Sequence, residues 1–292
     1  LGKGNLLEIN AMVATALMDM YAKCHIIAEA QQVHDNLLVR DVISWSALIT
    51  GYAQNGQGHE ALNCFLRMQA ESLAPNVVTF ISVIKACSSI GAIKEGKAIH
   101  NQIISREPLE EDVVLGTALV DMYAKCAALV NAQQVHDELS VRDVVSWSAL
   151  IAGYAQQGHG HQALSCFQRM RSEGITANAV TFVCVLKACG FAGDICEGKS
   201  VHDEIICRGL EEKNTSLCVT LVDMYAKCGE LAEAHQILES IPVRNVISWN
   251  ALITGHIQHG QGHEALDCFD RMQSEHLSPD AVTFTCILKA CG

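Results

Sequence analysis

Apolar residues recur at helical spacing along the chain, and residues 42–76 show the pattern clearly. Positions i, i+3, i+4 and i+7 of a first helix are Trp45, Leu48, Ile49 and Tyr52. After the break at Asn55-Gly56, a second helical series follows with Ala61, Leu62, Phe65 and Met68. Two such helices cannot cover all of their apolar surface alone, so neighbouring hairpins must stack. The pattern therefore predicts a series of stacked helical hairpins.

This pattern repeats with a period of 102 residues. The segment Thr15–Cys24 returns at Thr117–Cys126 and, in part, at Leu221–Cys228. All three tryptophans occupy one position of the period: Trp45, Trp147 and Trp249. Self-similarity of this kind is typical of a repeat protein, in which each repeat buries its apolar face against the next.

Each period divides into three pieces of 31, 35 and 36 residues, first seen as 11–41, 42–76 and 77–112. The series continues as 113–143, 144–178, 179–214, 215–245 and 246–280. Residues 1–10 read as the end of a truncated preceding piece, and residues 281–292 as the start of another. We therefore expect an all-α fold, a right-handed α-solenoid or superhelix of helix-turn-helix repeats in a single array over 1–292. Such a chain reads as a segment of a longer array or as an engineered one.

Composition and charge narrow the functional classes. Half of the 292 residues are apolar and only 18% are charged, which supplies a large core. No apolar run approaches the roughly 18 uncharged residues of a membrane span, and we see no secretory signal. The net charge of −12 argues against a sequence-blind nucleic-acid binder, but not against a protein that reads bases locally.

The 14 cysteines and several histidines invite a search for metal or catalytic sites. Nine cysteines recur with the period on apolar helix faces, where a free cysteine acts as a small apolar residue. One zinc-like pattern is present: Cys184, Cys189, His202 and Cys207. Its two leading cysteines are five residues apart on one helix, which is a poor arrangement for a tetrahedral ion. We expect no metal site and no bound cofactor.

Catalytic motifs are equally weak. His136-Asp137-Glu138 resembles the His-x-Glu of zinc deaminases, but the chain contains no Cys-x-x-Cys pair to hold the metal. His59 and Cys64 are five apart on one helix and do not converge as base and nucleophile. Gly56-Gln57-Gly58 lacks the third glycine of a phosphate loop. The sequence predicts no catalytic residues and no enzyme.

Pieces of 31, 35 and 36 residues in this order resemble the pentatricopeptide repeat family, and its plant class that alternates P, L and S motifs. Residues Val42–Ile49 with Glu60-Ala61-Leu62 carry the P type, here 42–76, 144–178 and 246–280. Val78-Thr79-Phe80 and Lys85-Ala86-Cys87 carry the L type, here 77–112 and 179–214 with the partial pieces 1–10 and 281–292. Leu119–Cys126 carries the S type, here 11–41, 113–143 and 215–245.

This resemblance implies that the chain binds single-stranded RNA, with one nucleotide per repeat. In the family, the fifth and last residues of a repeat read the base edge, and the second residue packs on the base. Carried over, Thr15 with Asp41 and Thr117 with Asp143 favour G, Ser46 with Asn76 and Ser148 with Asn178 favour A, and Asn250 with Asp280 favours U. The packing residues are Met12, Ile43, Val114, Val145 and Ile247. Together they predict 5′-GAnGAnnU-3′. For Asp41 and Asp143, helix capping alone is an alternative role.

Other repeats depart from this pattern. The apolar fifth residues Ile81 and Val183 of the L pieces offer no hydrogen bond, which makes them spacers or protein-contact sites. The third S piece has Val219 with Asn245, which weakens its expected purine preference. Lysines late in the first helices are candidate phosphate contacts: Lys23, Lys125 and Lys227, with Lys85, Lys187 and Lys289 from the L type. Solvated lysines are the alternative.

Members of this class are associated with C-to-U RNA editing in plastids and mitochondria, and with multiple organellar RNA editing factors that contact L motifs. The resemblance therefore implies an RNA-recognition protein with such a protein partner and no small-molecule substrate. We recognise neither the separate deaminase extension nor a transit peptide in this chain. The alternative is a protein-binding helical scaffold with little affinity for RNA.

Overall fold

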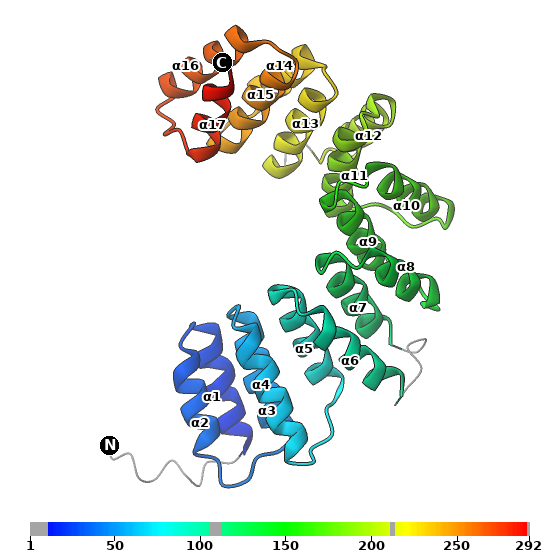
Figure 1. The fold of residues 1–292 in the computed structure, drawn as a ribbon, viewed down its shortest axis with the longest axis vertical. Coiled ribbons are helices and arrows are strands. Elements are labelled where there is room, and N and C mark those ends of the chain that lie inside the picture. Colours follow the sequence, from blue (N-terminus) through cyan, green and yellow to red (C-terminus); the bar gives the residue numbers. More distant parts are fainter. Residues whose placement is uncertain (1–10, 106–111, 211–213, 291–292) are drawn as a thin grey trace. The chain divides into compact units, whose positions relative to one another are not determined.

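The computed structural model describes residues 11–105, 112–210 and 214–290. These residues form seventeen helices, α1 to α17, and no strand (Figure 1). The all-α fold predicted from the sequence is confirmed. The repeat fragment expected at 1–10 and the end of the fragment expected at 281–292 lie outside the described residues.

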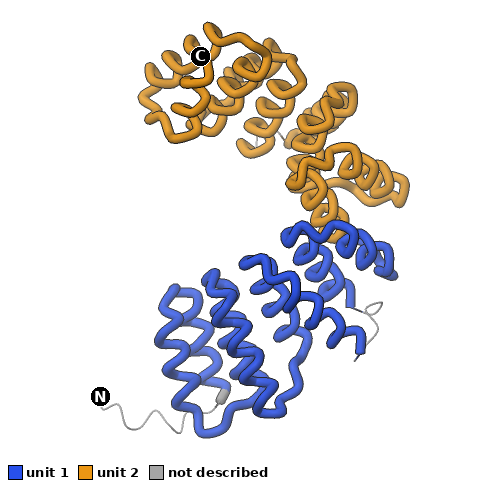
Figure 2. The backbone as a smooth tube through the Cα atoms, in the orientation of Figure 1, with its two compact units in different colours: residues 1–142 blue, residues 143–292 orange. Residues whose placement is uncertain are grey.

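The chain divides into two compact units, residues 1–142 and 143–292 (Figure 2). The first unit contains α1 Ala11–Lys23, α2 Ile27–Asp35, α3 Val42–Gln54, α4 Gly58–Ala70, α5 Val77–Ile90, α6 Ile93–Ile104, α7 Val113–Lys125 and α8 Leu129–Glu138. The second unit contains α9 Val144–Gln156, α10 Gly160–Ser172, α11 Ala179–Ala192, α12 Ile195–Cys207, α13 Thr215–Lys227, α14 Leu231–Ser240, α15 Val246–Gln258, α16 Gly262–Ser274 and α17 Ala281–Ala290. The boundary between the units lies beside the predicted junction of pieces 113–143 and 144–178.

Capping residues explain where the first helix of each hairpin begins. These helices begin at Ala11, Val42, Val77, Val113, Val144, Ala179, Thr215, Val246 and Ala281, which are the first residues of the predicted pieces. The residue before eight of them is an aspartate or asparagine whose side chain accepts a backbone N–H of the first turn: Asp41, Asn76, Asp112, Asp143, Asn178, Asn214, Asn245 and Asp280. Short side-chain acceptors at this position satisfy N–H groups that have no partner inside the helix.

Each unit has two layers of helices. In the first unit, the odd-numbered helices α1, α3, α5 and α7 pack against one another in chain order. In the second unit, α9, α11, α13, α15 and α17 do the same. The even-numbered helices form the other layer, because each packs on the first helix of its own hairpin, and all except α8 also pack on the first helix of the next hairpin in the same unit. The first turns of the odd-numbered helices are thus brought into a row within each unit.

A tryptophan anchors each P-type hairpin. Trp45, Trp147 and Trp249 are fully buried. In the second unit, the Trp249 indole N–H donates to Glu275 at 3.0 Å, and Arg271 lies over the ring at 5.3 Å. The other two tryptophans make the same pair of contacts with Glu71 and Arg67, and with Glu173 and Arg169. The recurring tryptophan position of the sequence therefore belongs to the core.

The Gly-x-Gly turns of the P-type hairpins have a conformational cause. Gly56 adopts a φ of 73°, a left-handed conformation that other residues rarely adopt. Gly58, at the start of α4, lies so close to α5 that an added Cβ would stand 2.8 Å from the carbonyl oxygen of Ala86. At Gly160, the same position of the next copy, the carbonyl oxygen of Ala188 would be 2.6 Å away. These glycines permit a turn and a close helix contact.

Among the described residues, no helix combines the length and apolar character that a membrane crossing requires.

Candidate nucleic-acid interface

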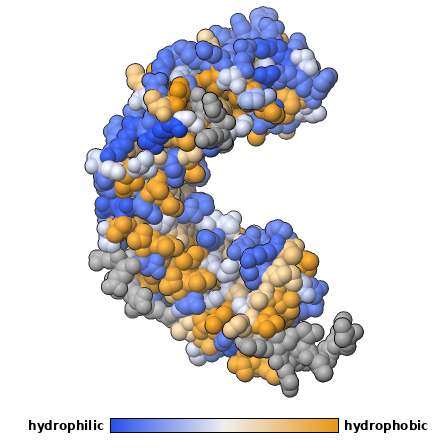
Figure 3. All heavy atoms as spheres, turned by 180° about the vertical axis from the view of Figure 1, so that it is seen from behind, coloured by the Kyte–Doolittle hydropathy of each residue, from blue (hydrophilic) through white to orange (hydrophobic). Residues whose placement is uncertain are grey.

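A row of exposed aliphatic side chains marks the first turns of the odd-numbered helices. The five residues predicted to pack on bases are 55% to 76% exposed: Met12, Ile43, Val114, Val145 and Ile247. Aliphatic residues are normally found inside a protein, so their regular exposure at one position is informative. Figure 3 shows apolar side chains on the surface of both units, among polar ones.

The row includes residues that the sequence analysis did not assign. Val78, Val180 and Val282 occupy the second position of the L-type pieces and are 54% to 62% exposed. The sequence could have identified these three valines, because they occupy the same second position of the repeat as the five predicted packing residues. That position can be recognised whether or not the fifth residue is polar. In the third S piece the same position is Ser216, which is exposed but not aliphatic.

The predicted fifth residues of the P pieces lie beneath this row. Ser46, Ser148 and Asn250 are buried, with 5% to 7% of their surface exposed. The Ser46 hydroxyl lies 2.6 Å from the Thr79 hydroxyl of the next hairpin, and also donates to the carbonyl oxygen of Val42 at 2.6 Å. The position therefore combines a polar group with a confined environment, in which an unsatisfied hydrogen bond is costly.

The predicted last residues all cap the helix that follows them. Asn76 accepts the Thr79 backbone N–H at 2.9 Å through Oδ1, and the Thr79 hydroxyl donates to the same atom at 2.9 Å. Asp41, Asp143 and Asn178 make equivalent caps with their Oδ1 atoms. The capping role considered for Asp41 and Asp143 is thus real in the structure, and it occupies Oδ1 of each side chain.

Within the P pieces, the structure brings the predicted reading pairs together. Asn250 Nδ2 donates directly to Asp280 Oδ1 at 3.0 Å. The Thr283 hydroxyl also joins them, because it donates to Asn250 Oδ1 at 2.7 Å and to Asp280 Oδ1 at 3.0 Å. The backbone N–H of Thr283 is the main cause that lowers the pKa of Asp280 below its ordinary value. Asp280 is therefore an ionised hydrogen-bond acceptor at neutral pH.

The threonines predicted to read G are placed differently. Thr15 is half-buried on α1, and Asp41 caps α3. Thr117 Oγ1 is buried and has no hydrogen-bond partner among the described residues. Its predicted partner Asp143 belongs to the second unit and caps α9 by accepting the backbone N–H groups of Val145 and Ser146.

A groove in the second unit is lined by several of these residues. It has a volume of about 640 Å³ and lies along α13, α15 and the start of α17. Its walls include the aliphatic residues Ile247 and Val282, the fifth residues Val219 and Asn250, and the last residue Asn245. Lys187 and Lys227 also line it. Two exposed aliphatic side chains thus flank a polar position inside one groove.

Three of the six candidate phosphate-contacting lysines, those of the S pieces, are ion-paired along their own helices. Lys23 lies 2.6 Å from Asp19, and Lys125 lies 2.7 Å from Asp121. Lys227 lies 2.7 Å from Asp223, and its ammonium group also stands 4.7 Å from the centre of the Phe191 ring. A phosphate would therefore have to compete with a carboxylate for each of these three lysines.

The two residues predicted to contact a protein partner are less accessible than the aliphatic row. Ile81 and Val183 are half-buried in α5 and α11. Each is one turn from an exposed valine of the same helix, Val78 or Val180. A partner reaching either L piece would contact the valine first.

The cysteines of the sequence-derived zinc pattern do not converge among the described residues. Burial raises the pKa of Cys189 to about 12 and that of Cys184 above its ordinary value, which keeps both thiols protonated and unreactive. The grouping of metal-ligating side chains that the described residues do contain is a different one: His235, His256 and Cys268. The sequence analysis did not identify it.

Comparisons with known proteins agree with this architecture. Residues 40–89, 142–190 and 244–292 match the PPR repeat family, and residues 216–246 match the PPR repeat. A chloroplastic pentatricopeptide repeat-containing protein of Arabidopsis thaliana is 37% identical over 99% of this chain. A mitochondrial one from the same plant is 35% identical over 98%. The chain covers 47% and 34% of these relatives.

Among solved structures, the pentatricopeptide repeat protein PPR10 in complex with an 18-nt psaJ RNA element matches with a TM-score of 0.83. The match covers 97% of this chain and 43% of PPR10, at 16% sequence identity, so it concerns the fold. The chain belongs to the PPR repeat family, and its fold is a helical-repeat solenoid.

Proposed function

We propose that this chain binds single-stranded RNA in a sequence-specific manner, with one nucleotide per repeat. The observation that carries the proposal is the row of exposed aliphatic side chains on the first turns, which in the P pieces is accompanied by a buried polar fifth residue, Ser46, Ser148 or Asn250. A base can stack on an aliphatic side chain while its edge reaches the polar groups, which is how single-stranded bases are recognised. The RNA-bound state of PPR10, a protein of the same fold, supports this assignment.

The groove of the second unit illustrates the proposed binding mode. A base seated between Ile247 and Val282 faces Asn250 and Asp280. The hydrogen bonds from Asn250 and Thr283 all go to Oδ1 of Asp280, and the base would meet the second carboxylate oxygen. That oxygen accepts from a base N–H, while the amide of Asn250 fixes the position of the carboxylate. The pair therefore favours a base that presents a donor to Asp280, and we assign it to U.

We extend the same reading to the other repeats. Thr15 with Asp41 and Thr117 with Asp143 select G, and Ser46 with Asn76 and Ser148 with Asn178 select A. With Asn250 and Asp280 for U, the preferred ligand is 5′-GAnGAnnU-3′. Since three lysines are ion-paired, few phosphates are neutralised. The logarithm of the binding constant should therefore fall with the logarithm of the salt concentration by only about 0.7 per phosphate contacted. Affinity is then modest, and stacking and base contacts carry most of the selectivity.

We further propose that the chain serves as the recognition part of organellar C-to-U RNA editing and is a PLS-type array without catalysis of its own. The L pieces would dock a multiple organellar RNA editing factor through the half-buried Ile81 and Val183. The chloroplastic and mitochondrial names of the relatives support an organellar setting. The net charge of −12 and the paired lysines favour the competing function, a protein-binding scaffold with little RNA affinity.

Fluorescence anisotropy with labelled GAnGAnnU RNA and a scrambled oligonucleotide, with and without an editing factor, tests the proposal. The decisive variant is Asn250→Thr, which creates the Thr-Asp pair that we assign to G. We expect its preference at the last nucleotide to move from U to G by at least about tenfold, since a well-formed pair of base contacts discriminates by roughly 1–3 kcal/mol.

Equal weak binding of both oligonucleotides, with and without the factor, would identify the chain as a protein scaffold. Tight binding of GAnGAnnU by the original protein with no change of preference in Asn250→Thr would retain RNA binding but reject the assignment of Asn250. The matched control is Thr254→Ser, one turn further along α15, which lines the same groove and has no assigned role in base reading.

A further inference from the structure

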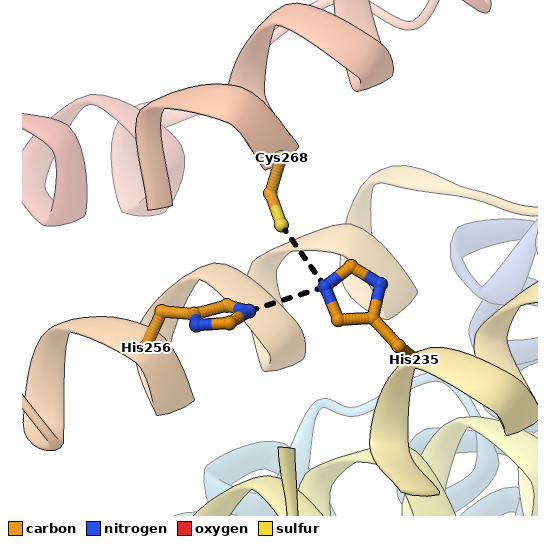
Figure 4. Close-up of side chains that lie close together, drawn as sticks. All are labelled: His235, His256 and Cys268. Atoms are coloured by element: carbon orange, nitrogen blue, oxygen red, sulfur yellow. Dashed lines mark hydrogen bonds between the residues drawn. The ribbon is translucent and has the colours of Figure 1, made fainter. Parts of the chain in front are cut away.

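Three metal-ligating side chains from consecutive helices converge in the second unit (Figure 4). His235 lies on α14, His256 on α15 and Cys268 on α16. Their ligand atoms all lie within 4.8 Å of one another. We propose that His235, His256 and Cys268 form a binding site for Zn²⁺.

The two distances from His235 to the other ligands match those of a zinc site. His256 Nε2 lies 3.2 Å from His235 Nε2, and Cys268 Sγ lies 3.7 Å from the same nitrogen of His235. Around a tetrahedral zinc ion, two nitrogen ligands stand about 3.3 Å apart, and a nitrogen and a sulfur about 3.6 Å apart, given the usual bond lengths. An ion can therefore enter with small side-chain rotations. Three protein ligands leave the fourth position to water.

A second hydrogen bond orients one of the ligands. His256 Nδ1 lies 2.8 Å from Gln261 Oε1. Because an amide oxygen can only accept, Nδ1 carries the proton, and the lone pair of Nε2 points toward His235. Metal-binding histidines usually have such a partner on the other ring nitrogen, which fixes the tautomer and strengthens metal binding.

The internal repeats show that this cluster is special to the third period. One and two periods earlier, the three positions are Gln133, Tyr154 and Cys166, and Gln31, Tyr52 and Cys64. In the first unit, the Tyr52 hydroxyl donates to Gln31 Oε1 at 2.9 Å. A tyrosine–glutamine hydrogen bond has thus been exchanged for two imidazoles, while the cysteine is unchanged. Packing alone is satisfied by either arrangement, and only the histidine version supplies three metal ligands.

Burial and charge around the cluster are compatible with an ion. Cys268 and His256 are buried, whereas His235 is half-buried and leaves a path from solvent. The nearby cation, Arg271, is paired with Glu239 at 3.1 Å, which offsets its repulsion of a metal. Burial raises the pKa of Cys268 to about 11, so the thiol keeps its proton in the metal-free protein. Formation of the Zn–S bond releases that proton to solvent.

The site also has a mechanical consequence. A single ion would connect α14, which ends one hairpin, to α15 and α16, which form the next. Metal binding to the folded state alone stabilises it, so Zn²⁺ should raise the unfolding temperature. This inference does not depend on the proposed RNA binding.

Zinc binding by the full chain, reduced and freed of metal, tests the proposal in competition with a chromophoric chelator. We expect one tight equivalent per chain, lost in the double variant His235→Gln with His256→Tyr. That variant rebuilds the pair seen at Gln31 and Tyr52, so it should fold, and its unfolding midpoint without metal checks this. Gln261→Ala should weaken binding about 10- to 100-fold.

Cobalt substitution gives an independent readout on the original protein. Co²⁺ should produce a thiolate-to-cobalt charge-transfer band and the visible spectrum of a four-coordinate ion. Cys268→Ala should abolish the band, whereas Cys64→Ala, the same position two periods earlier, should leave it unchanged. Equal zinc binding by the original chain and the double variant, or a cobalt spectrum without the charge-transfer band, would overturn the proposal.

Discussion

The tryptophan pockets of the two units share one plan and differ in one titratable residue. Trp45 in the first unit and Trp249 in the second are both fully buried. Against Trp45, the ring of His34 packs edge-on, with ring centroids 4.3 Å apart. Two periods later, the position of His34 is taken by Leu238, which is also fully buried. The tryptophan is thus constant, while its neighbour is exchanged between a polar and an apolar residue.

This exchange changes the chemistry of the pocket without changing the fold. Both ring nitrogens of His34 are buried and have no hydrogen-bond partner among the described residues. Burial, assisted by the positive charge of Arg40, lowers the pKa of His34 to about 4. The Trp45 pocket therefore contains an imidazole that is neutral in the folded protein at neutral pH, whereas Leu238 places no titratable group at the same position of the Trp249 pocket. The constant residues of the repeat determine the architecture, and the exchanged ones determine how each pocket responds to its surroundings.

The largest expected loss of stability follows from removing the tryptophan that both pockets share. Replacing Trp45 or Trp249 by alanine removes a fully buried side chain, and we expect each change to cost about 3–5 kcal/mol of unfolding free energy. Denaturant unfolding followed by circular dichroism measures the loss. A much smaller loss for one tryptophan would show that the two pockets are not equivalent anchors.

A smaller effect should follow pH and appear in one pocket only. Since the pKa of His34 lies below its unfolded value near 6.5, the unfolded chain takes up the proton first as pH falls. The stability from the neutral ring is present above pH 6.5 and decreases toward pH 4, by on the order of 3 kcal/mol. His34→Leu should remove this dependence, and Leu238→His should introduce it. Denaturation at several pH values checks both, and identical pH profiles for the original chain and His34→Leu would contradict the assignment.

The smallest expected effect is a difference in stability between variants of Glu71 and Glu275, the glutamates that accept the indole N–H of Trp45 and Trp249. Arg244 donates to Glu275 through Nε at 2.8 Å, whereas Arg40 only approaches Glu71 at 3.6 Å. These hydrogen bonds from Arg244 are the main cause that lowers the pKa of Glu275. Glu275→Gln should therefore cost about 1 kcal/mol more than Glu71→Gln.

The glutamate difference has its own pH signature. A carboxylate with a lowered pKa contributes stability above its unfolded pKa, near 4.3, and loses that contribution as pH falls through the lower folded value. The gap between Glu275→Gln and the original chain should hence narrow as the pH falls, which thermal unfolding at a series of pH values from 7 downward can show. A gap that does not change with pH would assign the cost to packing.

Local signals explain why so much of the fold was predictable. The apolar period identifies both helices of each hairpin, and an aspartate or asparagine before an apolar run marks the first residue of the next helix. Exposure of Ile43 or Val145 also follows from its position beside a cap. Contacts between hairpins were not predictable in the same way. Whether the Ser46 hydroxyl meets Thr79 depends on the distance between stacked helices, which residue spacing does not supply.

The cluster of His235, His256 and Cys268 shows the same limit. Its members are 21 and 12 residues apart and lie on three helices, so no compact spacing motif announces them. The zinc-like pattern that did stand out in the sequence has Cys184 and Cys189 on one helix, where they cannot converge. Comparing the three periods position by position would have detected the cluster. In the third copy, histidine replaces both the glutamine and the tyrosine that are hydrogen-bonded to each other in the first copy.

The close contact of the turn glycines has a consequence for length along the array. At Gly58 and Gly160, the backbone of the next hairpin lies too close to leave room for a Cβ atom. Each glycine therefore permits the short distance between two successive hairpins of its unit. A Gly58→Ala change would widen that step. Because the hairpins stack in series, widening one step would shift every later hairpin of that unit. A ligand with a constant distance between its subunits would then no longer align with the binding positions beyond the widened step. The distance between successive binding positions therefore depends on the absence of one Cβ atom at each of these glycines.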